Sequence, residues 1–147
     1  MEPIEIQITH DRIEDQSPVP AIDPRVGSQL EFRGLVRAEE SGRTIVALEY
    51  EAYLPMARRV LETLARDLLA RHGCLAVRVI HRLGVVPVGE TAIRIQVASR
   101  HRQEGLQFLQ DYLDQLKTEV PIWKVRALPL PSAIPDAPAA SVPVLPP

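Results

Sequence analysis

The two lysines of this sequence are the residues whose type and spacing most directly suggest chemistry. The chain of 147 residues has 17 basic residues, and only Lys117 and Lys124 among them are lysines. They lie seven residues apart, on either side of a Val-Pro pair at 120–121. An ammonium is a compact charge whose pKa falls readily on burial, so a lysine can act as general acid, general base or nucleophile, whereas an arginine cannot. Both lysines are therefore candidate catalytic residues.

Each lysine also has a purely structural interpretation. Lys117 falls in the last turn of a predicted helix, where a cation stabilises the helix dipole. Lys124 falls in an extended segment and would then be a solvated strand residue. Because the proline at 121 must end the helix and turn the chain, the two side chains are also placed to face one pocket. The sequence leaves both interpretations open.

A second candidate group is the segment Ser-Arg-His-Arg at 99–102, where a predicted strand gives way to a helix. The first turn of a helix favours acidic residues, because the helix dipole is positive there. Basic residues beside free backbone N–H groups suit an anion site instead, which makes Arg100, His101 and Arg102 candidate ligands of an anion. The alternative is a solvated basic turn paired with Glu104 or Asp67.

Composition and motifs exclude several other classes of protein. The net charge of −2 and the six aromatic residues argue against a nucleic-acid-binding module. Cys74 is the only cysteine, so one chain can form neither an internal disulfide nor a cysteine-based zinc site, and we expect it to be a small buried hydrophobic residue. His81 and His101 lack a third ligand at metal-binding spacing. No glycine-rich phosphate loop or zinc-protease motif is present.

The termini and the apolar runs suggest a cytoplasmic protein. The first ten residues do not combine a basic region with an apolar core, as a signal peptide would. No apolar run approaches the ~18 residues that a membrane-spanning helix needs. We therefore expect no membrane association.

The elements that must position these residues follow from the hydrophobic periodicity. Alternation predicts that 28–37 and 44–51 pair as a hairpin around a polar loop at 38–43, in which Gly34 marks a bulge or a close backbone approach. The second helix is expected to turn four leucines inward, which are Leu106, Leu109, Leu113 and Leu116. The full set comprises strands at 4–8, 28–37, 44–51, 74–84 and 91–99, helices at 54–73 and 100–120, and an extended segment at 121–128.

This order of elements predicts an α+β fold of antiparallel strands with two main amphipathic helices. Residues 1–128 are expected to form a single domain. Residues 129–147 hold half of the chain's 14 prolines, and we expect them to be a disordered tail.

Five segments together resemble the large, catalytic subunit of molybdopterin synthase, the MoaE family, through roughly residues 18–124. They occur in the order and at the spacing of that family. The segments are FRGLVR (32–37), LEYEAYLPMA (48–57), VIHRLGVVPVGE (79–90), SRHR (99–102) and LDQLKTEVPIWK (113–124).

The resemblance implies a fold of the α/β-hammerhead type and a homodimer within a heterotetramer, with a small ubiquitin-like sulfur-carrier subunit at each end. The implied reaction adds two sulfurs to cyclic pyranopterin monophosphate (precursor Z), forming the dithiolene of molybdopterin. The sulfur arrives as a thiocarboxylate on the C-terminal Gly-Gly of the carrier. No metal or cofactor is implied, and Cys74 need not carry sulfur.

Carried over by motif, the resemblance implies that Lys117 and Lys124 are catalytic and that Arg37, His101 and Arg102 bind the substrate. Three apolar residues, Phe32, Tyr53 and Met56, match positions near the site and the partner surface, although each is equally interpretable as core.

Two stretches depart from the family pattern. The loop at 38–43, Ala-Glu-Glu-Ser-Gly-Arg, is acidic where the family tends to have Asn and His. After Lys124, the sequence Val-Arg-Ala-Leu replaces a charged continuation, so that Arg126 is left to replace a basic residue from that region. The competing hypothesis is therefore a non-catalytic member that still binds the carrier subunit.

Overall fold

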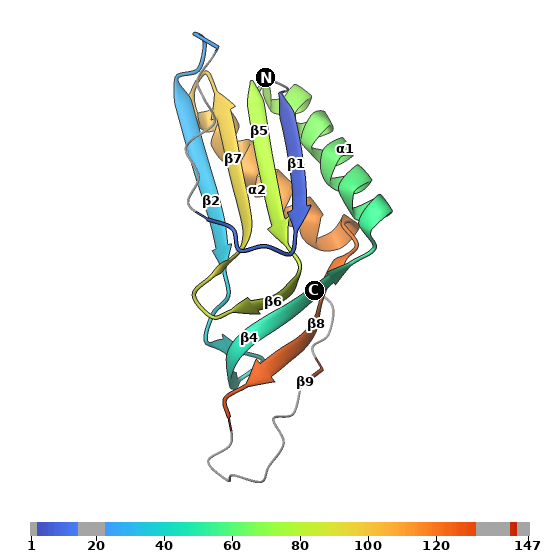
Figure 1. Ribbon diagram of the computed structural model, residues 1–147. Coiled ribbons are helices and arrows are strands. Elements are labelled where there is room, and N and C mark those ends of the chain that lie inside the picture. Colours follow the sequence, from blue (N-terminus) through green and yellow to red (C-terminus); the bar gives the residue numbers. More distant parts are fainter. Residues whose placement is uncertain (1–2, 15–22, 132–141, 144–147) are drawn as a thin grey trace.

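Two sheets and two helices make up the computed structural model, which describes residues 3–14, 23–131 and 142–143 (Figure 1). The first sheet has the strand order β1-β5-β7-β2, and the second has the order β3-β4-β8-β9 with β6 also paired to β4. The strands are β1 (Ile4–Thr9), β2 (Ser28–Leu35), β3 (Glu39–Glu40), β4 (Arg43–Ala52), β5 (Ala76–Arg82), β6 (Gly84–Pro87), β7 (Thr91–Ser99), β8 (Ile122–Pro129) and β9 (Val142–Pro143).

The helices are α1 (Leu54–His72) and α2 (Arg102–Glu119), and they pack against the first sheet to form the main core. In α1, the buried Leu61, Leu64 and Leu68 recur at helical spacing. Pro55 occupies the first turn, and Gly73 ends the helix in the left-handed conformation with φ of 70°. This helix is confirmed as the sequence predicted it.

The buried face of α2 differs from the prediction. Gly105, Phe108 and Tyr112 form its buried face, while Leu106 is 55% exposed. Leu109, Leu113 and Leu116 are partly buried and pack against the core. Leu106 follows Gly105 by one residue, which rotates its side chain about 100° away from the core. The expectation of four inward leucines was therefore wrong for Leu106.

The α+β fold class is confirmed, with one parallel strand pair in an otherwise antiparallel arrangement. Strand β1 pairs with β5 in parallel, while β5, β7 and β2 pair in antiparallel fashion. A parallel neighbour needs a long crossover, and the chain between β1 and β5 includes α1.

The predicted hairpin of 28–37 with 44–51 is wrong. Strand β2 pairs with β7, whereas β4 belongs to the second sheet and pairs with β3, β6 and β8. The register of β2 shifts between Gly34 and Leu35, where a Cβ on Gly34 would lie 2.9 Å from Ile93 Cγ2. The close approach expected at Gly34 is therefore present, and the chain leaves the first sheet directly after it.

The segment expected to be a tail is described only in part. Strand β8 extends to Pro129, and Val142–Pro143 pairs with Arg126 and Ala127 of β8. Residues 132–141 and 144–147 lie outside the described part of the chain, as do residues 1–2 and 15–22. Within the described residues, no helix is long and apolar enough to cross a membrane.

Candidate active site

The two lysines lie at the junction of α2 with β8. Lys117 is exposed in the last turn of α2, which ends at the cap residue Val120. Pro121 then turns the chain, and its carbonyl oxygen accepts a hydrogen bond of 3.1 Å from the N–H of Tyr53, at the start of α1. Lys124 follows in β8 and is paired in register with Tyr50 of β4. The expected break at Pro121 is confirmed, and it connects the helix of one lysine to the strand of the other.

Lys124 has an anionic neighbour that the sequence did not predict. Its Nζ donates a hydrogen bond of 3.2 Å to Oε2 of Glu40, which lies on β3. The side chains are 26% and 16% exposed, respectively, so solvent reaches the ion pair only in part. Lys124 is therefore not the fully solvated strand residue of the structural alternative.

Tyr50 lies beside this ion pair and stays a neutral phenol. Burial, followed by the negative charge of Glu40, raises the pKa of Tyr50 to about 12. The edge of its ring meets His81, with 5.6 Å between ring centroids. Burial lowers the pKa of His81 to about 4, so this imidazole is neutral near pH 7. Neither ring is charged at neutral pH, and the ionic groups of this cluster are Lys124 and Glu40.

Arg37 lies in the segment that leads from β2 to β3, the strand that carries the ion-pair partner of Lys124. It is exposed and follows Val36, which is buried at 3% exposure. The backbone of Val36 is fixed on both sides, because its N–H donates to Glu90 and its carbonyl oxygen accepts from Gly89. Arg37 precedes Glu40 by three residues, at the entrance to β3.

The Ser-Arg-His-Arg segment begins α2 at its opposite end, and its geometry is partly self-satisfied. The N–H of His101 donates a hydrogen bond of 2.8 Å to Oε2 of Glu104, and this bond is the main cause of a lowered pKa for Glu104. Nδ1 of His101 also lies 3.4 Å from Oε1 of Glu104. The pairing with Glu104 that the alternative interpretation named is therefore present. Arg102 is exposed and lines, with His101 and Leu106, an open hollow of about 430 Å³.

Two glycines that the sequence reasoning missed hold this turn in place. A Cβ on Gly27 would lie 2.4 Å from the carbonyl oxygen of Arg100, and the N–H of Gly27 donates to the carbonyl oxygen of Ser99. A Cβ on Gly105 would lie 3.0 Å from Leu30 Cδ1 and 3.2 Å from Ser99 Oγ. Gly27 therefore lets the start of β2 approach the backbone after β7, and Gly105 lets α2 pack closely on the end of β7.

The candidate residues fall into two groups within one chain. Lys117 lies fifteen residues after Arg102 on the same helix, which corresponds to about 22 Å along the helix axis. Figure 1 shows that the end of α2 joins β8 beside the second sheet, away from the end of β7 where α2 begins. Lys117 and Lys124 therefore lie where α2 ends, His101 and Arg102 lie where it begins, and Arg37 lies in the segment between β2 and β3.

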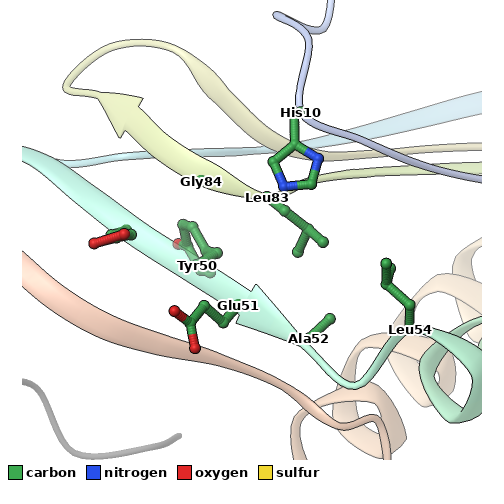
Figure 2. A pocket seen from close by; sticks show the side chains of 8 residues that line it. His10, Tyr50, Glu51, Ala52, Leu54, Leu83 and Gly84 are labelled. Atoms are coloured by element: carbon green, nitrogen blue, oxygen red, sulfur yellow. The ribbon is translucent and has the colours of Figure 1, made fainter.

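A cavity of about 400 Å³ lies next to the lysine end, at the C-terminal end of β4 (Figure 2). Figure 2 shows Tyr50 and Leu83 facing this space, with His10 above and Leu54 of α1 at one side. Its walls are acidic in part, because Glu49 and Glu51 contribute to them. The candidate lysines do not line it, so the cavity adjoins the candidate site without containing it. Its lining residues are His10, Glu49, Tyr50, Glu51, Ala52, Leu54, Leu83 and Gly84.

The uncharged candidate residues differ in how far they are buried. Cys74 is a buried thiol, and burial raises its pKa to about 11, which fits the expected small hydrophobic residue. Phe32 is partly buried against the main core. Tyr53 and Met56 are 60% and 41% exposed, so they are available for contact with a partner. Among the residues that the structure describes, no three His, Cys, Asp or Glu side chains are grouped to hold a metal ion.

Comparisons with known proteins agree on one family. The model of the MoaE protein family matches residues 2–119. A molybdopterin synthase catalytic subunit of Neurospora crassa is 35% identical over 122 residues, which cover 82% of this chain and 59% of that protein. The subunit of the same name from Arabidopsis thaliana is 43% identical over 101 residues, covering 69% and 51%. The chain thus spans about half the length of the curated relatives it matches.

A solved structure gives the same result for the fold. The crystal structure of molybdopterin synthase from Staphylococcus aureus superposes with a TM-score of 0.70 at 27% sequence identity. The superposition covers 90% of this chain and 95% of that chain. The two-sheet, two-helix architecture is therefore shared across nearly the full length of that protein.

Proposed function

Because this chain belongs to the MoaE protein family, we propose that it is the catalytic subunit of a molybdopterin synthase. In this function it transfers sulfur from a thiocarboxylated ubiquitin-like carrier to cyclic pyranopterin monophosphate (precursor Z), and the dithiolene of molybdopterin is formed. The proposal needs no resident metal or cofactor. It includes a cytoplasmic site of action and a heterotetramer of two catalytic and two carrier subunits.

The observation that carries the proposal is the placement of the only two lysines at the junction of α2 and β8, within a chain that matches the family. Sulfur transfer from a thiocarboxylate requires a group that can hold the anionic carrier terminus and exchange a proton or a covalent bond. Lys117 and Lys124 are the candidates for these two tasks. Arg37, three residues before the Glu40 that pairs with Lys124, adds a guanidinium that can pair with a carboxylate or a phosphate.

The phosphate of the substrate is assigned to His101 and Arg102. Both side chains are exposed at the start of α2, where the helix dipole favours an anion and the carboxylate of Glu104 already accepts from the N–H of His101. They lie about 22 Å along the helix from Lys117, farther than one pterin monophosphate reaches within a single chain. We therefore propose that a two-fold homodimer brings the α2 start of one protomer next to the lysines of its partner.

The test is a dithiolene-forming assay with thiocarboxylated carrier and precursor Z. Lys117→Ala and Lys124→Ala are each expected to lower the rate by roughly 10²-fold or more, because proton transfer and nucleophilic catalysis contribute on that scale. Arg66→Ala is the matched control, since Arg66 is exposed on α1 and pairs only with Glu62 in the described structure. Wild-type rates in both alanine variants would contradict the assignment.

Arginine at either lysine position refines this test. It keeps the positive charge but cannot exchange a proton near neutral pH. Low rates in Lys117→Arg or Lys124→Arg therefore indicate proton or acyl exchange at that position, and retained rates indicate that only the charge is used.

A non-catalytic protein that binds the carrier is the second candidate function. The observation in its favour is the ion pair of Lys124 with Glu40, because the candidate catalytic amine is occupied by an acidic residue of the loop that departs from the family pattern. Carrier binding by calorimetry without any dithiolene product would support this second function and contradict the first.

A further inference from the structure

The ion pair between Lys124 and Glu40 occupies an amine that the proposed function assigns to the carrier terminus. Nζ of Lys124 lies 3.2 Å from Oε2 of Glu40, and both side chains remain partly exposed. An ammonium that has lost part of its hydration is stabilised by one anionic partner. A second anion can replace that partner without leaving the ammonium unpaired.

The backbone holds Glu40 in this position before any partner arrives. Glu40 ends the two-residue strand β3 and is paired in register with Arg43 of β4. The connecting residues Ser41 and Gly42 have φ angles of 52° and 76°, as a tight two-residue hairpin turn requires. The carboxylate is therefore presented by a short hairpin, and its side chain can move without unfolding an element of the main core.

Glu40 is the anionic group beside Lys124, since the neighbouring Tyr50 is neutral. Tyr50, which pairs with Lys124 across β4 and β8, is a neutral phenol whose raised pKa reflects burial first and the charge of Glu40 second. Glu40 lies on the loop in which this sequence is acidic where the family resemblance implies Asn and His. The family resemblance therefore supplies no role for this carboxylate.

We propose that Glu40 is an internal stand-in for the carboxyl terminus of the carrier subunit. In the free protein it holds the ammonium of Lys124, and the terminal carboxylate or thiocarboxylate of the carrier replaces it on docking. No covalent bond forms or breaks in this exchange, because one anion takes the place of another and the displaced carboxylate is hydrated by solvent. This inference rests on the proposed function, since it presupposes a carrier that reaches Lys124.

The first experiment measures the affinity of a ubiquitin-like carrier that ends in a Gly-Gly carboxylate. Glu40→Gln removes the charge at nearly constant shape and is expected to bind this carrier about fivefold more tightly than wild type, which is the scale of a partly exposed ion pair. The same carrier with an amidated terminus should show no such gain. Glu39→Gln is the matched control, because Glu39 is the exposed neighbour on β3.

The second experiment examines Lys124 without any carrier. The chain has only two lysines, so limited acetylation with acetic anhydride followed by mass spectrometry reports Lys124 against Lys117 as an internal reference. Glu40→Gln is expected to raise the labelling of Lys124 relative to Lys117 several-fold, whereas Glu39→Gln should leave the ratio unchanged. An unchanged ratio in Glu40→Gln would show that the carboxylate does not hold the amine in solution.

The two experiments separate failure of the exchange from failure of the proposed function. If wild type binds no carrier, or if Lys124→Ala binds it as tightly as wild type does, the proposed function of this lysine is wrong. If wild type binds and Lys124→Ala weakens binding, but Glu40→Gln binds equally or more weakly, then Glu40 does not compete with the carrier. That result would overturn the exchange while leaving sulfur transfer standing.

Discussion

Burial decides which side chains near the lysine end can carry a charge. His81 is 5% exposed, and its Nδ1 lies 2.9 Å from the carbonyl oxygen of Arg82, to which the neutral ring donates. Burial outweighs this contact and lowers the pKa of His81 to about 4. The imidazole is therefore a structural, neutral ring between Tyr50 and the backbone and is not a proton donor at neutral pH.

This burial predicts a pH dependence of stability. Between about pH 6.5 and pH 4 the unfolded chain binds a proton at His81 that the folded chain excludes, so the folded state loses stability as the pH falls. From pH 7 to pH 5 the expected loss from this residue is about 2 kcal/mol. Urea denaturation at both pH values should show a smaller loss for His81→Phe, which keeps an aromatic ring next to Tyr50. An equal loss in wild type and variant would show that the folded state does not exclude a proton from His81.

At the scale of single residues, the sequence predicted which residues are candidates for the site better than it predicted which side chains they contact. The excess of arginine over lysine was sufficient to select Lys117 and Lys124, and the basic helix start selected His101 and Arg102. The pairing of Lys124 with Glu40 was not predictable, because it joins positions 84 residues apart through a hairpin that alternation alone had assigned as a loop.

At the scale of elements, two glycines allow β2 and α2 to pack closely around the end of β7. Gly27 approaches the carbonyl oxygen of Arg100 so closely that a Cβ would lie 2.4 Å away, against rigid backbone. A Cβ on Gly105 would lie 3.0 Å from the end of the Leu30 side chain and 3.2 Å from Ser99 Oγ, and both of these neighbours are side-chain atoms that can move. Both residues are glycines, but an added methyl group would meet backbone at Gly27 and side-chain atoms at Gly105.

We predict that Gly27→Ala and Gly105→Ala differ in cost. Gly27→Ala should destabilise the fold by about 1–3 kcal/mol, since overpacking against backbone is not relieved by a rotamer change. Gly105→Ala should lie within about 1 kcal/mol of wild type, because the gain in helix propensity offsets a mild contact. Chemical denaturation of both variants provides the comparison. Equal stabilities would show that the turn at Ser99–Arg102 tolerates a larger separation from β2.

The elements themselves were largely predictable, but their partners were not. Hydrophobic periodicity located both helices and the main strands, since it reports which residues face a core. It does not report which strand lies alongside, and the predicted pairing of 28–37 with 44–51 failed because the bulge at Gly34 and Leu35 sends the chain into the second sheet. The short strand β3 lies in the stretch that was expected to be a loop, and β6 begins at the last residue of the strand that was expected at 74–84.

At the scale of the whole molecule, four of the five candidate residues divide between the two ends of α2. The last turn of α2 and the start of β8 hold the two lysines, and the start of α2 holds His101 and Arg102, with about 22 Å of helix between Arg102 and Lys117. The sequence placed all five in one site by resemblance, but it contained no information on their separation. A two-fold dimer would reconcile the resemblance with this geometry. In such a dimer, the α2 start of each protomer can meet the lysines of the other, so that two equivalent sites form.

Dithiolene formation by mixed protomers tests whether the site is shared across the dimer. Lys124→Ala and the double variant His101→Ala with Arg102→Ala are each expected to be nearly inactive alone. After the two proteins are unfolded and refolded together, half of the dimers are mixed, and each mixed dimer has one intact site. The expected rate is therefore roughly a quarter of the wild-type rate, if each site is shared between protomers. A mixture as inactive as its components would contradict a site built from the lysines of one protomer and the α2 start of the other.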